Sequence, residues 1–193
     1  AFSISPESRL GNDLKRHLMM KPNGSVSSEI DLSWQHLSVA YIALVLQLAR
    51  YWFLHEYGDW YIQRKIVWEF NLGAPSSSQQ FGNIKEIFVE VARASWLASV
   101  DHRGVTLDAV RLALECAKDE SKLVEASPHY DERKVHNDLI NVIPEVLAEV
   151  HGYKMSGAAH AKGMHLIVDV GATTLDAAMF ILSQNNGQPR TSS

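Results

Sequence analysis

Hydrophobic residues follow two periods along the chain, and the stretches with helical spacing predict three long helices. A short helix is expected at 13–20, and three longer helices are expected to begin near a capping Ser or Thr. The longer helices are predicted from Ser33 to about Tyr57, from the serines at 76–78 to about Leu97, and from Gly104 to Lys118 with Thr106 as the cap. Gly58 is the expected stop of the first long helix.

Shorter runs with the pattern of strands separate these helices. Residues 66–72 alternate between apolar and polar side chains, and three later apolar runs lie at 139–143, 165–170 and 174–182. Strands that alternate with helices are typical of an α/β fold. We therefore predict one mixed sheet that contains all four runs, with flanking helices. The 165–170 strand is expected to be buried on both faces.

The helix predicted from Ser33 is the most apolar part of the chain. Beyond its inner stripe it carries Ile42, Leu46 and Phe53, so we expect it to pack on more than one side. Its strongly apolar core, 37–46, is shorter than the ~20 residues that a membrane span requires. No membrane partner is therefore expected.

Composition narrows the function classes. With 193 residues, 46% hydrophobic and 21% charged, the chain has the material for one domain or one large lobe. The net charge of −4 comes without basic clusters, so nucleic acid is not an expected partner. The single cysteine, Cys116, is expected to be a small core residue in a reducing, cytoplasmic setting, and no signal peptide is recognised. The sequence contains no Walker loop or Gly-x-Ser-x-Gly elbow, which leaves P-loop and acyl-transfer chemistry without support.

Candidate chemistry is concentrated where Asp169 interrupts an apolar strand. Burying a carboxylate costs several kcal/mol unless its charge is compensated. Gly171 and the small residues after it would let a ligand reach backbone N–H groups that form an anion-binding concavity. A neighbouring carboxylate can hold Mg2+ together with phosphate oxygens. The pattern indicates nucleotide-phosphate binding; the alternative is an ordinary hairpin with a polar turn and a hydrogen-bonded Asp169.

The stretch Asp169-Val-Gly171-Ala-Thr-Thr174-Leu-Asp176 resembles the second phosphate motif of the actin-like ATPase superfamily. It is closest to the Asp-Leu-Gly-Gly-Gly-Thr-Phe-Asp form of the seventy-kilodalton heat-shock chaperones. Other segments resemble chaperone elements in the same order. The strand and Gly-Pro-Ser turn at 66–78 are similar to the chaperones' Val-Pro-Ala segment. The segment with Pro144-Glu145 is similar to their Ile-Asn-Glu-Pro-Thr-Ala-Ala-Ala element, and residues 157–163 are similar to their Gly-rich loop.

The resemblance implies a ribonuclease H-like lobe that binds ATP or ADP with Mg2+. In that lobe Asp169 would face the metal, Glu145 would lie beside the attacking water, and Asp176 would help to orient water or metal. Phosphate contacts would come from the turn residues, which are Gly171, Ala172, Thr173 and Thr174. Simpler roles stay open: Glu145 can stabilise its helix N-terminus, and Thr174 and Asp176 can make cross-strand hydrogen bonds.

By this resemblance, residues 1–32 are N-terminal loops with a short helix. Residues 33–193 are an actin-like ATPase lobe with a helical insertion at about 99–134. The family's first phosphate motif, its phosphate-contacting lysine and its adenosine-binding lobe have no counterpart in these residues. The lobe is therefore expected to be incomplete, with Mg2+-dependent hydrolysis only when the rest of its polypeptide supplies the missing lobe.

Two departures from the family pattern leave a second function open. Ala172 and Thr173 stand where the family usually has Gly, and their Cβ atoms narrow the approach to the backbone N–H groups. The alternative is a degenerate actin-like fold without hydrolysis. Such a fold would serve as a binding or filament-assembly module, with a protein client or copies of itself as the partner.

Overall fold

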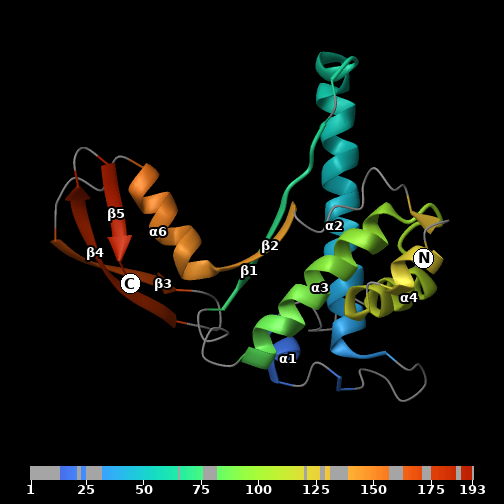
Figure 1. The fold of residues 1–193 in the computed structure, drawn as a ribbon, viewed down its shortest axis with the longest axis horizontal. Helices are drawn as coiled ribbons and strands as arrows, with labels where there is room; N and C mark the ends of the chain where they lie inside the picture. The colour runs from blue at the N-terminus through green and yellow to red at the C-terminus, as the bar shows by residue number, and fades with distance from the viewer. Residues whose placement is uncertain are drawn as a thin grey trace. The chain divides into compact units, whose positions relative to one another are not determined.

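The computed structural model describes residues 14–20, 23–24, 32–64, 66–75, 82–119, 121–126, 129–130, 139–156, 163–170, 175–185 and 188–192. These residues form α-helices and two small sheets, which confirms the mixed α/β class (Figure 1). The helices are α1 (Leu14–Met20), α2 (Trp34–Tyr57), α3 (Gly82–Val100), α4 (Leu107–Lys118), α5 (Ser121–Ala126), α6 (Glu145–Met155) and a short 3-10 helix, η2 (Gly58–Tyr61). The strands are β1 (Phe70–Ala74), β2 (Ile140–Pro144), β3 (Gly163–Val170), β4 (Leu175–Asn185) and β5 (Gln188–Ser192).

The chain divides into two compact units. The first unit comprises Ala1–Leu72 and Glu86–Asn141, and the second comprises Gly73–Lys85 and Val142–Ser193. Strands β1 and β2 pair in a two-stranded parallel sheet, and the division falls inside both of them. Strands β3, β4 and β5 form a separate antiparallel sheet in the second unit.

The prediction of one sheet is therefore wrong for the part of the chain that is described. The runs at 66–72 and 139–143 correspond to the β1–β2 pair, whereas those at 165–170 and 174–182 correspond to the β3–β4 hairpin. Strand β1 also begins four residues later than predicted, at Phe70, and takes in Gly73 and Ala74, which were assigned to a turn. Hydrophobic period identifies strands but not their pairing partners, because pairing between distant segments leaves no local trace.

Helix α2 begins as predicted. The Ser33 hydroxyl accepts a hydrogen bond from the His36 N–H at 3.4 Å, and the His36 Nδ1 accepts one from the Ser33 N–H at 3.1 Å. This reciprocal pair satisfies backbone donors that have no partner inside the helix. At the other end Gly58 keeps a right-handed φ of −53°, so the chain continues into η2 instead of stopping at a left-handed glycine.

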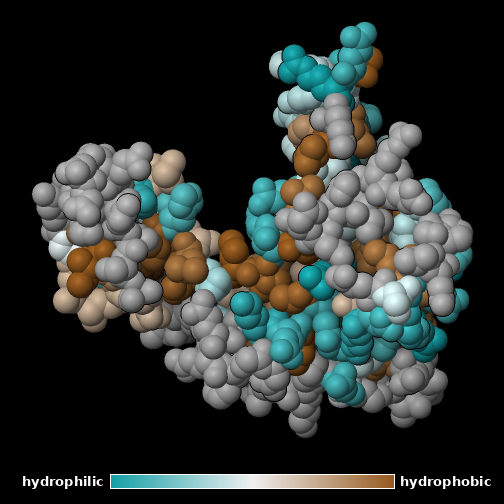
Figure 2. Space-filling view, in the orientation of Figure 1, coloured by the Kyte–Doolittle hydropathy of each residue, from teal (hydrophilic) through white to brown (hydrophobic). Residues whose placement is uncertain are grey.

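The expectation that α2 packs on more than one side is wrong. Its N-terminal half is anchored through Val39 and Ala43, which are fully buried, and α2 contacts α1 and α4. Farther along, large apolar side chains are exposed, among them Leu48 at 65% and Tyr51 at 69%. Hydrophobic residues are accordingly visible on the surface of α2 in Figure 2.

The length and composition of α2 also correct the membrane argument. The helical stretch Trp34–Tyr61 has 28 residues and a mean hydropathy of 1.5 in its most apolar window, which is 17% buried. By length and composition it is the one helix of the described chain that is able to cross a membrane. A soluble core helix meets the same criteria, so this finding assigns no location.

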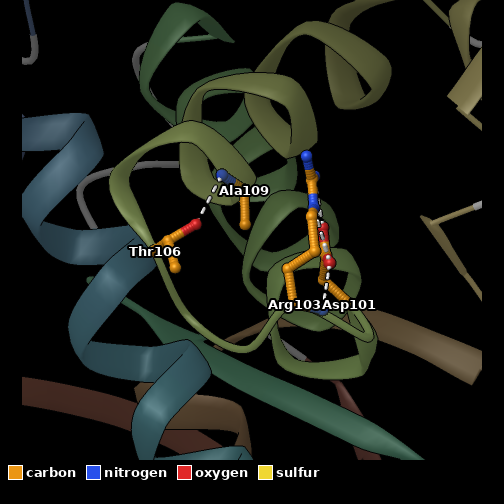
Figure 3. Close-up of polar contacts among 4 residues, drawn as sticks. All are labelled: Asp101, Arg103, Thr106 and Ala109. Atoms are coloured by element: carbon orange, nitrogen blue, oxygen red, sulfur yellow. Dashed lines mark hydrogen bonds and ion pairs between the residues drawn. The ribbon is translucent and has the colours of Figure 1, made fainter.

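Most of the buried residues of the first unit belong to α3 and α4. On α3, Phe88, Val91 and Ser95 are buried, whereas Ile84 on the same side of the predicted helix is half-buried. Helix α4 starts as predicted, because the Thr106 hydroxyl accepts a hydrogen bond from the Ala109 N–H at 3.2 Å (Figure 3). Cys116 is 2% exposed, which confirms its place in the core, and this burial raises the pKa of its thiol.

Part of the segment between α4 and β2 is helical. Residues 119–134 are highly charged and lack an apolar period, yet Ser121–Ala126 forms α5, which contacts α4. The Asp119 carboxylate starts this turn by accepting hydrogen bonds from the Ser121 N–H at 3.0 Å and its hydroxyl at 2.7 Å. Local capping thus replaces hydrophobic periodicity as the cause of this short helix.

An ion pair between the buried Asp101 and the exposed Arg103 closes the turn after α3. The Asp101 side chain is inaccessible to solvent, and its carboxylate accepts hydrogen bonds from Arg103 Nε at 3.0 Å and Nη2 at 2.6 Å (Figure 3). Burial alone would raise the pKa of Asp101, but the hydrogen bonds and charge of Arg103 outweigh it and hold the pKa below its ordinary value.

Candidate functional site

The β3–β4 hairpin places two of the predicted site residues, Asp169 and Asp176, opposite each other. Its antiparallel register pairs Asp169 directly with Asp176, followed by Val170 with Leu175 next to the turn. Residues paired in this way lie on one face of a sheet with Cβ atoms about 4.5–5.5 Å apart, and like charges there repel. A cation or several hydrogen-bond donors would relieve that repulsion. The register thus places the two aspartate positions opposite each other, next to the turn.

The predicted phosphate-binding residues of the turn itself, Gly171, Ala172, Thr173 and Thr174, lie outside the described residues. Their proposed contacts remain predictions. The strands on either side of them are as expected, since β3 (Gly163–Val170) and β4 (Leu175–Asn185) form antiparallel neighbours.

One face of the hairpin packs against α6. Val150 of α6 forms a buried cluster with Phe180 and Leu182 of β4, and Tyr153 and Ile167 pack against that cluster. This contact fixes the orientation of α6 on the hairpin, and Glu145 begins the same helix.

The other face of the hairpin is exposed, so the prediction that the 165–170 strand is buried on both faces is wrong. Leu166 is 62% exposed and Val168 is also exposed on β3. Exposed apolar residues continue along the hairpin: Met164, Met179 and Ile181. Figure 2 shows hydrophobic surface on this unit, at the left of the view.

A polar contact that the sequence analysis missed joins α6 to β3. The Tyr153 hydroxyl lies 3.2 Å from His165 Nδ1, and the His165 ring stacks on Phe180 with centroids 5.6 Å apart. Tyr153 lies three residues after Val150 on α6, so helical spacing was the one available signal for it.

Glu145 occupies the first position of α6. Pro144 ends β2 and caps the helix with φ −61° and ψ 133°, and Glu145 is half-buried. In the chaperone element the Glu precedes the proline, whereas here Glu145 follows it. A carboxylate in the first turn favours the helix dipole, so the simpler role of Glu145 also fits this position.

The side chain of Glu145 lies against β1. A Cβ atom placed on Gly73 would be 3.0 Å from Glu145 Cγ and 3.4 Å from Oε1. The three predicted catalytic residues thus fall in two places. Asp169 and Asp176 share one register position of the hairpin, and Glu145 opens α6 over β1.

The donor set at the hairpin fits Mg2+ better than a softer metal. Asp169 and Asp176 would offer hard oxygen ligands, and Mg2+ commonly binds one or two carboxylates while phosphates and water complete its shell. Within the described ranges there is no group of three or more His, Cys, Asp or Glu side chains placed to hold a metal.

No protein-family model, curated protein or solved structure matches the chain. The resemblance to the actin-like ATPases consequently rests on the residues quoted above.

Proposed function

We propose that this chain carries the second phosphate motif of an actin-like, chaperone-type ATPase, as part of its nucleotide-binding lobe. The observation that carries the proposal is the register of Asp169 with Asp176 on either side of a short turn. That register agrees with a phosphate hairpin in which both carboxylates flank the bound phosphates. Bound Mg2+ would neutralise phosphate charge during phosphoryl transfer to water.

Each predicted site residue would have its own role in this lobe. Asp169 would hold the metal, the N–H groups of 171–174 would hold phosphate oxygens, and Asp176 would orient water or metal. Glu145 would orient the attacking water from the start of α6. A lobe elsewhere in the same polypeptide would hold the adenosine, and the compartment would be cytoplasmic.

Two observations count against a close match to the chaperones. The strands fall in two sheets, and Glu145 lies on the other side of its proline. The proposal therefore rests on the local hairpin and on the order of strand, Pro-Glu helix and hairpin, which is the order of β2, α6 and β3–β4.

A second candidate function, a binding or assembly module without hydrolysis, is favoured by one observation. The outer face of β3 and β4 exposes five large apolar residues, which are Met164, Leu166, Val168, Met179 and Ile181. Contiguous exposed apolar surface of this kind is typical of interaction sites. Under this alternative the hairpin would serve association with a partner, and its carboxylates would have no role in turnover.

Single-turnover ATP hydrolysis by a polypeptide that carries both lobes distinguishes the two candidates. Glu145→Ala is expected to lower the rate by about 10²–10⁴, the usual contribution of a positioned acid or base, with little change in ATP affinity. Asp169→Asn is expected to weaken the dependence on Mg2+ as well as the rate. Unchanged hydrolysis in both variants would leave the binding-module function as the better account.

Asp108→Ala is the matched control. Asp108 is an exposed acidic residue in the first turn of α4, as Glu145 is in the first turn of α6. If both residues only favour their helix dipoles, each substitution lowers stability by about 0.3–1 kcal/mol and neither alters hydrolysis. A rate effect confined to Glu145→Ala supports the catalytic role.

A further inference from the structure

Gly73 lies inside strand β1, where a glycine has no conformational reason to be. A glycine in a strand interior is destabilising by roughly 0.5–1 kcal/mol relative to alanine. Among the described glycines the left-handed φ values belong to Gly104 and Gly163, so the backbone at Gly73 would accept an L-residue. A glycine in such a position often marks the close approach of another group.

The group that approaches Gly73 is the side chain of Glu145. The three heavy atoms nearest to a Cβ at Gly73 all belong to Glu145: Cγ at 3.0 Å, Oε1 at 3.4 Å and Cδ at 3.7 Å. By contrast, Gly152 in α6 and Gly58 after α2 have no heavy atom within 4 Å of an added Cβ. The Glu145 side chain therefore lies along β1 in the space that a side chain at 73 would fill.

We infer that Gly73 is a positioning residue for the Glu145 carboxylate. This inference rests on the proposed function, in which Glu145 orients the attacking water. An alanine at 73 would move Glu145 Cγ by a few tenths of an ångström, and the carboxylate would move with it. Misplacement by 1 Å can reduce a rate by about a hundredfold, so a smaller shift predicts a loss of roughly three- to tenfold.

The contact is tested on the chain itself by a double-mutant cycle of thermal melting. Gly73→Ala is expected to lower the Tm by about 2–5 °C, the size of shift that a modest clash produces in a domain of this size. In the Glu145→Ala background Gly73→Ala should not lower the Tm, because the Glu145 atoms that the new Cβ would approach are absent. The control Gly152→Ala should not depend on the residue at 145. Equal effects of Gly73→Ala in both backgrounds would overturn the inference.

The positioning role is tested by hydrolysis in a polypeptide with both lobes. Gly73→Ala is expected to lower kcat about three- to tenfold with unchanged ATP affinity, and to have no further effect when Glu145 is already Ala. If Glu145→Ala lowers kcat and Gly73→Ala does not, the inference fails while the proposed function stands. If Glu145→Ala leaves kcat unchanged, the proposed function fails and the positioning role fails with it, even where melting confirms the contact.

Discussion

Arg50 joins α2 to the end of α3, and its replacement by Ala should destabilise the first unit markedly. Its Nη1 donates a hydrogen bond to the Ser99 hydroxyl at 2.9 Å, its Nη2 donates to the Ser99 carbonyl, and its guanidinium lies 5.0 Å from the centre of the Trp96 ring. The last carbonyls of a helix have no partner inside it, so Arg50 satisfies one of them. Burial lowers the pKa of Arg50, which shows that this cation is partly removed from water.

The size of the loss follows from these contacts. Ser99 is buried, and its hydroxyl keeps a hydrogen bond to the Trp96 carbonyl at 2.6 Å when Arg50 is removed. The group left without its partner is the Ser99 carbonyl, at a cost of about 1–3 kcal/mol. The stacking on Trp96 adds about 0.5–1 kcal/mol. Arg50→Ala should therefore lower the free energy of unfolding by about 2–4 kcal/mol.

Urea unfolding followed by tryptophan fluorescence is the assay, because all five tryptophans lie in the first unit. With a slope of about 2 kcal/mol per molar urea, the expected loss shifts the midpoint by about 1–2 M. Arg50→Met should lower the free energy of unfolding by most of the same amount, because methionine keeps an aliphatic stem but has no hydrogen-bond donors. Arg64→Ala, at an exposed arginine, is the control and should change stability by less than about 0.5 kcal/mol. A loss at Arg50 no larger than at Arg64 would refute the reasoning.

Three further predictions concern other parts of the chain. The pKa of Asp101 lies below its ordinary value of 3.8, so its ionised form stabilises the fold above about pH 4, and this contribution is lost as the pH falls through the folded-state pKa. Urea unfolding between pH 5 and 2, in about half-unit steps, should show a smaller acid-linked loss in Asp101→Asn than in the wild type, and identical slopes would contradict this. Thr106→Ala should cost about 1 kcal/mol by removing the α4 cap, whereas Thr106→Ser should retain most of the stability in the same assay. The chain by itself should hydrolyse ATP negligibly, because phosphates held from one side lack most of the positioning that accelerates transfer; robust Mg2+-dependent turnover that Asp169→Asn abolishes would show this to be wrong.

Elements with strong local signals were predictable from the sequence. Helix α4 combines an apolar period with the Thr106 cap, and the β3–β4 hairpin combines two apolar runs with a Gly turn. The pairing of Asp169 with Asp176 follows from the same signal, since both positions are counted outwards from that turn. Such features depend on residues close in sequence, where period and capping determine the structure.

Features that depend on distant residues were not predictable. The apolar period of α2 is the same whether Leu48 is packed or exposed, so burial on several sides could not be inferred from it. Pairing of the strands into two sheets likewise has no local signature. Gly73 was assigned to a turn because glycine is typical of turns, and its contact with Glu145 spans 72 positions of sequence. Only the folded arrangement reveals why a side chain is excluded there.

We propose that the β3–β4 turn holds the phosphates of a Mg2+-bound nucleotide. Backbone amide NMR of the 193-residue chain, titrated with ATP with and without Mg2+, tests it most directly. The account predicts shifts concentrated at residues 169–176 that require Mg2+ and disappear in Asp169→Asn, while Asp108→Asn leaves them unchanged. Two results would contradict this proposal. One is no shift of these amides at about 10 mM Mg2+–ATP, a concentration well above the Kd expected of a half-site. The other is a set of shifts that persists in Asp169→Asn.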